Sequence, residues 1–409
     1  MSDTLFERDF SWRLEGEIMS DSSKPYLLSR RNFLKIGMAG ATTVATGVDG
    51  FRSVAKALTS VAQAAEAPVY RTLGRTGLKI TTLSFGAMLT PEPEVIRAGF
   101  DMGINYVDTA RRYLNGRSEE IVSRALKGIR DKVYVATKTQ RTSTTRDEVM
   151  KDIETSLAQL HTDHIDVIQV HGLESGKQVF IPELRETYAK AKEQGKVRFF
   201  GVSTHTNQAE VVNAVVDDPD KFFDTVLVQY NYNSEPAVKQ AIARAKAAGV
   251  GVIAMKIQMG GYKTREDAKA MTPEQAAANL KWVLQDTNVT NAIPGMRTIE
   301  QVTQMVPVMG MKLTKADERI LRSYAQAIDP YYCRLCGQCE GTCPNGVSIS
   351  TINRALMYAE GYREYALAKA TFDEVPTASL CLTCSECVAQ CVKGLDIAQK
   401  MRQARSAFA

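Results

Sequence analysis

"RDEVMKDIETSLAQLHTDHIDVIQVHG", residues 146–172, contains the two kinds of element from which the fold is built. The apolar residues of its first half are spaced for one face of a helix: Val149, Ile153, Leu157 and Leu160. Its second half, "IDVIQVHG", is a short and nearly continuous apolar run, which is typical of a strand buried on both faces of a parallel sheet. The stretch therefore predicts one helix–strand unit of an α/β fold.

The same alternation continues on both sides of this stretch. Strand-like runs occur in this order: "ITTLSFG", "INYVDTA", "VYVATKT", "IDVIQVHG", "VRFFGVST", "DTVLVQYN", "VGVIAMK" and "VTNAIPG". Helix-type segments separate them, and the repeats extend over about 250 residues, the usual length of a closed (β/α)₈ TIM barrel. An open doubly wound sheet is the alternative. No GxGxxG motif follows any of these runs, which disfavours an open dinucleotide-binding sheet.

Polar residues follow three successive strands of the predicted barrel. Catalytic side chains of such barrels lie at the carboxyl ends of the strands. Asp108 ends the second run, with Tyr113 five residues later; Lys138 ends the third run and His171 the fourth. Singly, each has an ordinary structural explanation. Together they predict a proton donor, in which the lysine lowers the pKa of the tyrosine, the aspartate holds the lysine and the histidine orients a carbonyl group.

All eight cysteines lie in two runs near the carboxyl end, "CRLCGQCEGTCP" at 333–344 and "CLTCSECVAQCV" at 381–392. Three thiolates within seven residues, followed by a fourth that serves the other centre, is the spacing of a protein with two [4Fe–4S] clusters. One predicted ligand set is Cys333, Cys336, Cys339 and Cys391, and the other is Cys381, Cys384, Cys387 and Cys343. Four disulfides or two zinc sites are the alternatives. The run "SISTINRALMYAEGYREYALAKA" between them predicts a helix, so the segment resembles a small α-helical ferredoxin.

The amino-terminal segment predicts export. Arg30 and Arg31 open the stretch "RRNFLKIGMAGATTVATG", which has the features of a twin-arginine signal, and small residues up to Ala64 offer a cleavage site. A basic arm of a cytosolic protein is the alternative. The apolar stretch is shorter than the roughly 20 residues of a membrane-spanning helix. We therefore expect no stable transmembrane span, and a location in the periplasm or at the outer face of the cytoplasmic membrane.

From about Tyr70 to Ala325 the chain resembles the aldo-keto reductase family. The motifs "INYVDTARRY", "VYVATKT", "DVIQVHG", "GVST", "VQYNYN" and "IPGMRTIEQV" occur in the family's order, after a stretch similar to the hairpin that closes its barrel. The resemblance implies a carbonyl reductase or alcohol dehydrogenase linked to NADP(H), with Asp108, Tyr113, Lys138 and His171 as catalytic tetrad. The positions that it implies for the nucleotide are Ser203, Thr204, Gln229, Gly295, Arg297 and Gln301. Thr204 replaces a common asparagine, and Met255 replaces an aromatic residue that often stacks on nicotinamide.

These features predict a chain of three parts: an extension with the export signal at 1–67, the barrel at 68–325 and the ferredoxin-like domain at 326–409. Of its 409 residues 44% are hydrophobic, the net charge is +5, and no basic stripe predicts nucleic-acid binding. We expect an exported oxidoreductase that acts on a small carbonyl or alcohol and exchanges electrons with a redox protein or quinone-linked partner. The alternatives are an electron-transfer subunit with the barrel as scaffold, or clusters that only stabilise the carboxyl end.

Overall fold

The computed structural model describes residues 68–140, 142–260, 271–384 and 386–408. Contacts divide the chain into Met1–Ala64 and Ala65–Ala409, and all described residues belong to the second unit. The predicted export signal at 1–67 lies outside the described residues and stays a prediction. Among the described residues, no helix is both long and apolar enough to cross a membrane.

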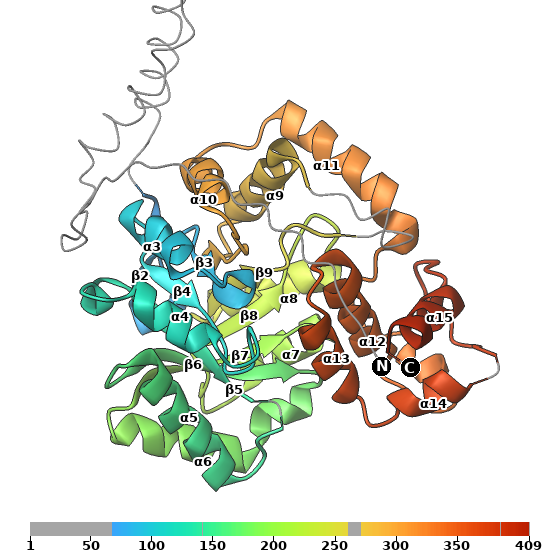
Figure 1. Ribbon diagram of the computed structural model, residues 1–409, viewed down its shortest axis with the longest axis horizontal. Helices are drawn as coiled ribbons and strands as arrows, with labels where there is room; N and C mark the ends of the chain where they lie inside the picture. Colours follow the sequence, from blue (N-terminus) through green and yellow to red (C-terminus); the bar gives the residue numbers. More distant parts are fainter. Residues whose placement is uncertain (1–67, 141, 261–270, 385, 409) are drawn as a thin grey trace, which may run out of the picture. The chain divides into compact units, whose positions relative to one another are not determined.

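Eight parallel strands form one sheet in which neighbours in sequence are neighbours in space (Figure 1). They are β3 (Phe85–Gly86), β4 (Tyr106–Asp108), β5 (Tyr134–Thr139), β6 (Ile165–Leu173), β7 (Val197–Thr204), β8 (Thr225–Gln229), β9 (Gly251–Met255) and β10 (Asn291–Ala292). The two edges meet, because parallel bridges join Leu83 to Ala292 and Gly86 to Gly295. The sheet therefore curls until its first and last strands pair, as a (β/α)₈ barrel requires.

Helices connect the strands, as the alternating pattern predicts. They are α3 (Pro93–Asp101), α4 (Ser118–Ala125), α5 (Arg146–Leu160), α6 (Pro182–Glu193), α7 (Gln208–Asp217), α8 (Pro236–Ala247), α9 (Pro273–Gln285) and α10 (Ile299–Met305). Thr145 and Glu148 form a capping box that starts α5. Gly195 and Gly249 follow α6 and α8 with φ of +72° and +77°, the left-handed conformation in which glycine commonly ends a helix.

A hairpin of β1 (Tyr70–Thr72) and β2 (Lys79–Thr81) closes the amino-terminal end of the barrel. Its residues Leu73, Leu78 and Ile80 are buried among inward-facing side chains of the strands. The prediction of one strand for "ITTLSFG" is therefore wrong. The backbone N–H of Thr82 still bonds to the hairpin at Val69 (2.8 Å), whereas that of Ser84 bonds to Ala292 (2.9 Å) in the barrel, so the run serves two sheets in turn.

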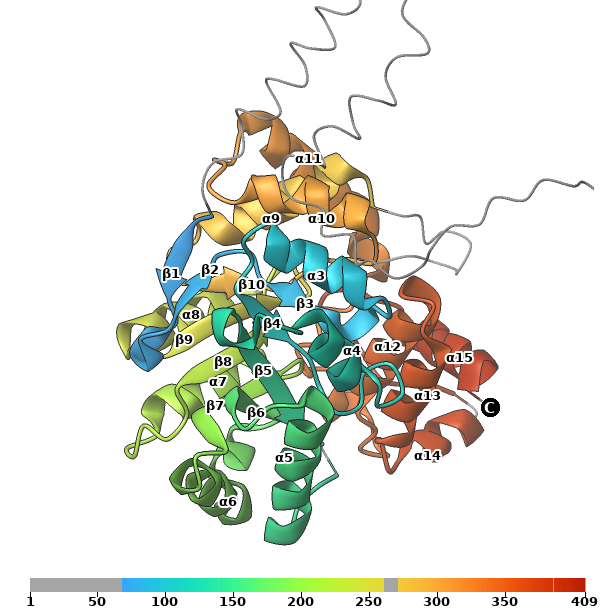
Figure 2. The same ribbon diagram turned by 60° about the vertical axis from the view of Figure 1, so that its left-hand side comes forward.

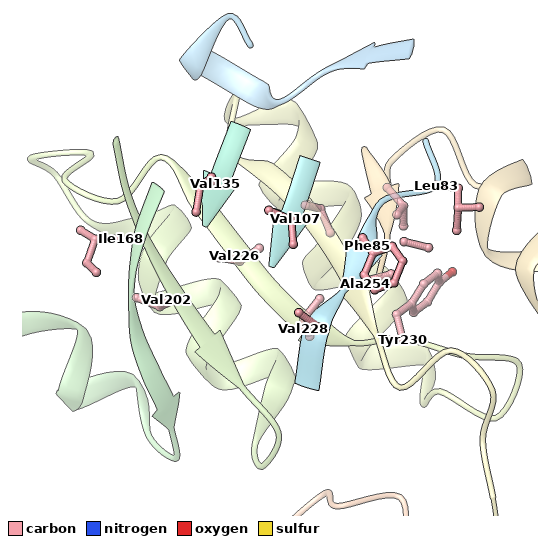
Figure 3. Close-up of a cluster of buried hydrophobic side chains, with 14 of the residues drawn as sticks. Leu83, Phe85, Val107, Val135, Ile168, Val202, Val226, Val228, Tyr230 and Ala254 are labelled. Atoms are coloured by element: carbon pink, nitrogen blue, oxygen red, sulfur yellow. The ribbon is translucent and has the colours of Figure 1, made fainter. Parts of the chain in front are cut away.

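The main apolar core lies between the strands and the helices. Figure 3 shows part of it, where Phe85, Val107, Val135, Val226 and Val228 gather with none of their surface exposed. Burying a side chain of this size stabilises the fold by about 1.5–3 kcal/mol. Packing on this scale fixes the strands, and with them the side chains at the strand ends.

The carboxyl-terminal segment is helical and has an apolar cluster of its own, built around Ile352, Leu356, Phe372, Met401 and Phe408. It follows α11 (Lys315–Ile328), which packs against α9 of the barrel, and its elements are α12 (Ile349–Leu356), a π-helical turn η8 (Met357–Gly361), α13 (Tyr365–Asp373), α14 (Ala378–Thr383) and α15 (Ile397–Phe408). The single helix predicted between the cysteine runs is wrong. The chain widens into the π turn and reverses at Arg363, whose φ of +58° is left-handed.

Hydrogen bonds dock this segment on loops that follow the barrel strands. Thr351 donates to the Glu174 carboxylate (2.9 Å), Gln208 donates to the Arg334 carbonyl (3.2 Å), and the hydroxyls of Thr206 and Ser350 are 3.2 Å apart. In both ribbon views α12 and α13 lie nearer the barrel than α15 does (Figures 1 and 2). The carboxyl-terminal segment therefore packs on the barrel.

Candidate active site

The four residues predicted to act together converge at the carboxyl ends of β4, β5 and β6. Asp108 ends β4, and Tyr113 follows that strand. Lys138 lies near the end of β5, and His171 lies near the end of β6. All four are at most 8% exposed. The rings of Tyr113 and His171 are 5.8 Å apart between centroids and almost perpendicular, and the Lys138 ammonium is 5.0 Å from the centre of the Tyr113 ring.

Hydrogen bonds to two oxygen atoms hold the ammonium group of Lys138 in place. Its ammonium donates to the Asp108 carboxylate and to the Thr109 carbonyl (2.7 Å). The other Asp108 oxygen accepts from the Gln169 amide (2.8 Å). Burial lowers the pKa of Lys138 and raises that of Asp108, and their ion pair opposes both shifts. The pair is therefore a buried, hydrogen-bonded unit that fixes the lysine beside Tyr113.

The pKa of Tyr113 differs from the prediction. Burial raises its pKa well above 10, and the nearby Asp108 and Tyr358 add to the increase. The prediction that this pKa is lowered is wrong, because desolvation outweighs the cations that lower it, Arg112 and Arg354. The hydrogen bonds of Lys138 go to Asp108 and Thr109. Tyr113 is thus protonated at neutral pH and suits a proton donor to a strongly basic oxygen.

The positions implied for a nucleotide carry protein contacts of two kinds. Within the barrel, the Ser203 hydroxyl accepts from Gly172 (2.8 Å), Thr204 donates to Thr206 (2.7 Å), and Gln301 accepts from the backbone N–H of Arg297 (2.7 Å). Two more contacts come from the carboxyl-terminal segment. Gln229 donates to the Tyr332 hydroxyl (3.3 Å), and the Arg297 guanidinium donates to the Tyr362 carbonyl (2.8 Å). The segment therefore covers part of the expected nucleotide site.

A cavity of about 610 Å³, open to solvent, lies at the tetrad, and we call it the tetrad cavity. Asp108, Tyr113, Lys256, Gly295 and Tyr362 are among the residues that line it. A second cavity of about 510 Å³, which we call the bridging cavity, has Gln229, Lys256, Tyr332, Cys333 and Arg354 in its wall. Lys256 therefore faces both spaces.

Sequence reasoning missed Lys256 and the tyrosines around it. A signal for Lys256 was present, because it directly follows the run "VGVIAM" and so occupies a strand end like Asp108 and Lys138. Tyr332, Tyr358 and Tyr362 reach the site from a segment more than 200 positions further along the chain than Asp108. Apolar spacing within that segment carried no information on which face would dock.

The structure brings the cysteines together in the two predicted sets. A third cavity, of about 410 Å³, is lined by Cys333, Cys336, Cys339 and Cys391. Burial raises the pKa of Cys333 to about 12, and Cys339, Cys336 and Cys391 contribute. Burial also raises the pKa of Cys381, with contributions from Cys387, Cys384 and Cys343. All eight are free thiols, so the predicted alternative of four disulfides is not found.

The cysteine sets are not arranged as sites for a single metal ion. Among the described residues, no group of three or more His, Cys, Asp or Glu side chains is arranged to hold one ion. A four-iron cubane takes each cysteine at a separate corner, so its ligand sulfurs stand further apart than those around one ion.

Comparisons with known proteins agree with this geometry. Residues 90–279 match the aldo/keto reductase family. L-galactose dehydrogenase of Arabidopsis thaliana is 26% identical over 302 residues, which are 64% of this chain and 94% of that protein. Methylglyoxal reductase YeaE of Escherichia coli is 29% identical over 240 residues, 56% of this chain and 83% of that protein.

Solved structures show the same fold. The crystal structure of an aldo-keto reductase from Klebsiella pneumoniae in complex with NADPH superimposes with a TM-score of 0.53 at 24% identity, over 63% of this chain and 96% of that one. Sequence and fold thus agree on the barrel region. The chain contains an aldo/keto reductase family domain and is an oxidoreductase of the aldo-keto reductase type.

Proposed function

We propose that this protein is an exported, NADP(H)-linked oxidoreductase that reduces a small carbonyl compound, or oxidises the alcohol, and exchanges electrons through two [4Fe–4S] clusters. The observation that carries the proposal is the convergence of Asp108, Tyr113, Lys138 and His171 at the strand ends, beside a cavity that Asp108 and Tyr113 line. A related barrel that was solved with NADPH supports the choice of nucleotide. The paired arginines at Arg30 and Arg31 support export.

The tetrad residues have distinct tasks in this reaction. A bound nicotinamide supplies the hydride. Tyr113, protonated because burial raises its pKa, donates its proton to the substrate oxygen. Lys138, fixed by Asp108, keeps a positive charge beside the phenol ring and stabilises the phenolate that remains. His171, almost perpendicular to Tyr113, is placed to orient the carbonyl group.

The residues of the carboxyl-terminal segment fit two iron–sulfur clusters. Each set contains four free thiols, and cysteines of both sets lie against the apolar cluster of that segment. Cys333, Cys336, Cys339 and Cys391 would hold one cluster and Cys343, Cys381, Cys384 and Cys387 the other. Such clusters transfer single electrons, and a redox protein or quinone-linked partner is the matching class of partner.

A second candidate function is that of an electron-transfer subunit whose barrel no longer uses a nucleotide. The contacts of Tyr332 with Gln229 and of Tyr362 with Arg297 favour it, because they engage two positions that a nucleotide needs. The complete tetrad favours the first proposal.

Turnover separates these candidates. NADPH oxidation is measured without oxygen, with aldehydes and quinones as acceptors, for the wild type, Tyr113→Phe and the exposed control Tyr70→Phe. The proposal expects Tyr113→Phe to lose about 10²-fold or more in carbonyl-dependent rate, the usual worth of a general acid. Equal rates in all three proteins would assign the barrel a scaffold role.

Cofactor content and location are tested on the same material. Protein purified without oxygen should contain roughly eight iron and eight sulfide per chain, as two four-iron clusters require. A reversible EPR signal distinguishes electron transfer from purely structural clusters. Replacing Arg30 and Arg31 by lysine should keep the protein in the cytoplasmic fraction, and unchanged export would contradict the signal assignment.

A further inference from the structure

Lys256 occupies a strained and conspicuous position beside the tetrad. It directly follows β9, at the end of the barrel where chemistry is placed, and its φ of +55° is rare for a residue with a side chain. Its ammonium lies 4.6 Å and 4.8 Å from the ring centres of Tyr358 and Tyr362, on the π-helical turn and just after it. Two segments with unusual backbone conformations thus meet at one ammonium group, a combination typical of functional sites.

Among the described residues, the charges around this ammonium are not balanced. Lys138 is paired with Asp108, and Arg112 and Arg354 share the Glu374 carboxylate. No carboxylate in the described part of the chain lies within ion-pair distance of Lys256. Burial lowers the pKa of Lys256, but Tyr358 and Tyr362 outweigh burial and hold it above its usual value. Lys256 is therefore a cation at neutral pH, and it gives the tetrad cavity a positive charge that no carboxylate among the described residues pairs with.

We propose that Lys256 binds the carboxylate of the substrate in the tetrad cavity, so that the protein acts on carbonyl compounds that carry an acid group. Lys256 lines that cavity together with Asp108 and Tyr113, which places an anion receptor and a proton donor in one wall. A partly buried ammonium gains most from an anion, because hydrogen bonds between charged groups are the strong ones. Tyr358 and Tyr362 position the ammonium from the carboxyl-terminal segment.

This inference rests on the proposed function for the identity of the reacting group, but its test does not need turnover. The probes are 4-carboxybenzaldehyde and methyl 4-formylbenzoate, which have the same core and differ in charge. Their binding to the full-length wild type, Lys256→Met and Lys192→Met is measured by calorimetry without nucleotide. Lys192 is a matched control, because it also lies over two aromatic rings, Phe199 (5.7 Å) and Phe200 (5.1 Å), but near the start of β7.

The wild type and Lys192→Met should bind the acid about tenfold more tightly than the ester, the usual worth of one charged hydrogen bond. Lys256→Met should bind the two probes equally. Tyr358→Phe, which keeps the ring, should reduce the preference without abolishing it. Loss of acid binding in Lys256→Met with unchanged ester binding would also show that the variant is folded.

Three results would overturn the inference: no acid preference in the wild type, the same preference in Lys256→Met, or a Lys256→Met defect confined to NADPH affinity in a fluorescence titration. The last would assign the lysine to the nucleotide phosphates. If neither aldehyde supports NADPH oxidation, the proposed function fails, whereas the calorimetric comparison still decides whether Lys256 binds a carboxylate.

Discussion

Replacing Tyr332 by phenylalanine should loosen the docking of the carboxyl-terminal segment. The Tyr332 hydroxyl accepts hydrogen bonds from the side-chain amides of Asn231 (2.8 Å) and Gln229 (3.3 Å), and all three residues are at most 6% exposed. A neutral hydrogen bond contributes about 0.5–1.5 kcal/mol, and a buried donor left without a partner costs about 1–3 kcal/mol. The hydrogen bond from Asn231 is short and the one from Gln229 is long. We therefore expect Tyr332→Phe to lower the free energy of unfolding by about 2 kcal/mol.

The same substitution should improve nucleotide binding. Gln229 is an expected ligand of the nicotinamide carboxamide, and in the structure its amide donates to Tyr332. Phenylalanine removes this competitor, so binding no longer has to break a bond of about 0.5–1 kcal/mol. The Kd for NADPH should therefore fall about two- to fivefold. Stability and affinity are thus expected to change in opposite directions.

Urea unfolding and a fluorescence titration with NADPH measure the two effects. Tyr70→Phe, at a position that is 49% exposed, is the control and should change neither. Iron content is measured in parallel, because Tyr332 precedes Cys333. Unaltered stability, or an NADPH affinity that is unchanged or weaker at normal iron content, would refute the view that Tyr332 and the nucleotide compete for Gln229.

Two further substitutions test the contact of α11 with α9 and the docking of the first cysteine run on the barrel. Burial raises the pKa of Asp317, but hydrogen bonds from Thr314 and Lys281 prevail and hold it below its ordinary value. Its contribution to stability is thus present above about pH 4, near the carboxyl pKa of the unfolded chain, and is lost as the pH falls through the folded pKa. Asp317→Asn should cost about 1–2 kcal/mol at pH 7 by urea unfolding, and this cost should shrink as the pH falls through the folded pKa; a difference that does not depend on pH would contradict this. Gly337 has φ of +75°, and a Cβ there would lie 2.4 Å from the Asn207 Oδ1 atom. Gly337→Ala should therefore lower the iron content per chain, and an iron content equal to the wild type would count against the docking of this loop.

The strand order explains why part of the site could be predicted from the sequence. Parallel strands that are neighbours in sequence place their carboxyl ends side by side, so Asp108, Lys138 and His171 had to lie close together once the barrel was recognised. The same argument applies to Lys256 at the end of β9. The split of "ITTLSFG" was not predictable by this route, because a hairpin strand and a barrel strand have the same apolar spacing.

The sequence did not predict which residues cover the carboxyl ends of the strands. The pKa of Tyr113 depends on how far water is excluded, and Tyr358, which adds to the increase, comes from the carboxyl-terminal segment. Gly361 ends the π turn, but no pattern in residues 348–370 indicates the face that meets the barrel. Desolvation is a property of the assembled unit, so the direction of this pKa shift could be obtained only with both segments in place.

The carboxyl-terminal segment therefore contributes residues to the candidate active site and also contains the two sets of cysteines. Its Tyr332 contacts Gln229, the next residue is Cys333, and one cavity has Gln229, Lys256 and Cys333 in its wall. A shortened chain that ends before Tyr332 would remove the acceptor for Gln229 and would leave Lys256 without Tyr358 and Tyr362. Such a barrel would differ from the intact protein in hydrogen bonding, charge and solvation at the tetrad. Because of these shared contacts, single substitutions in the full-length chain, rather than separated domains, are the way to learn how the hydride and one-electron chemistry proposed here are connected.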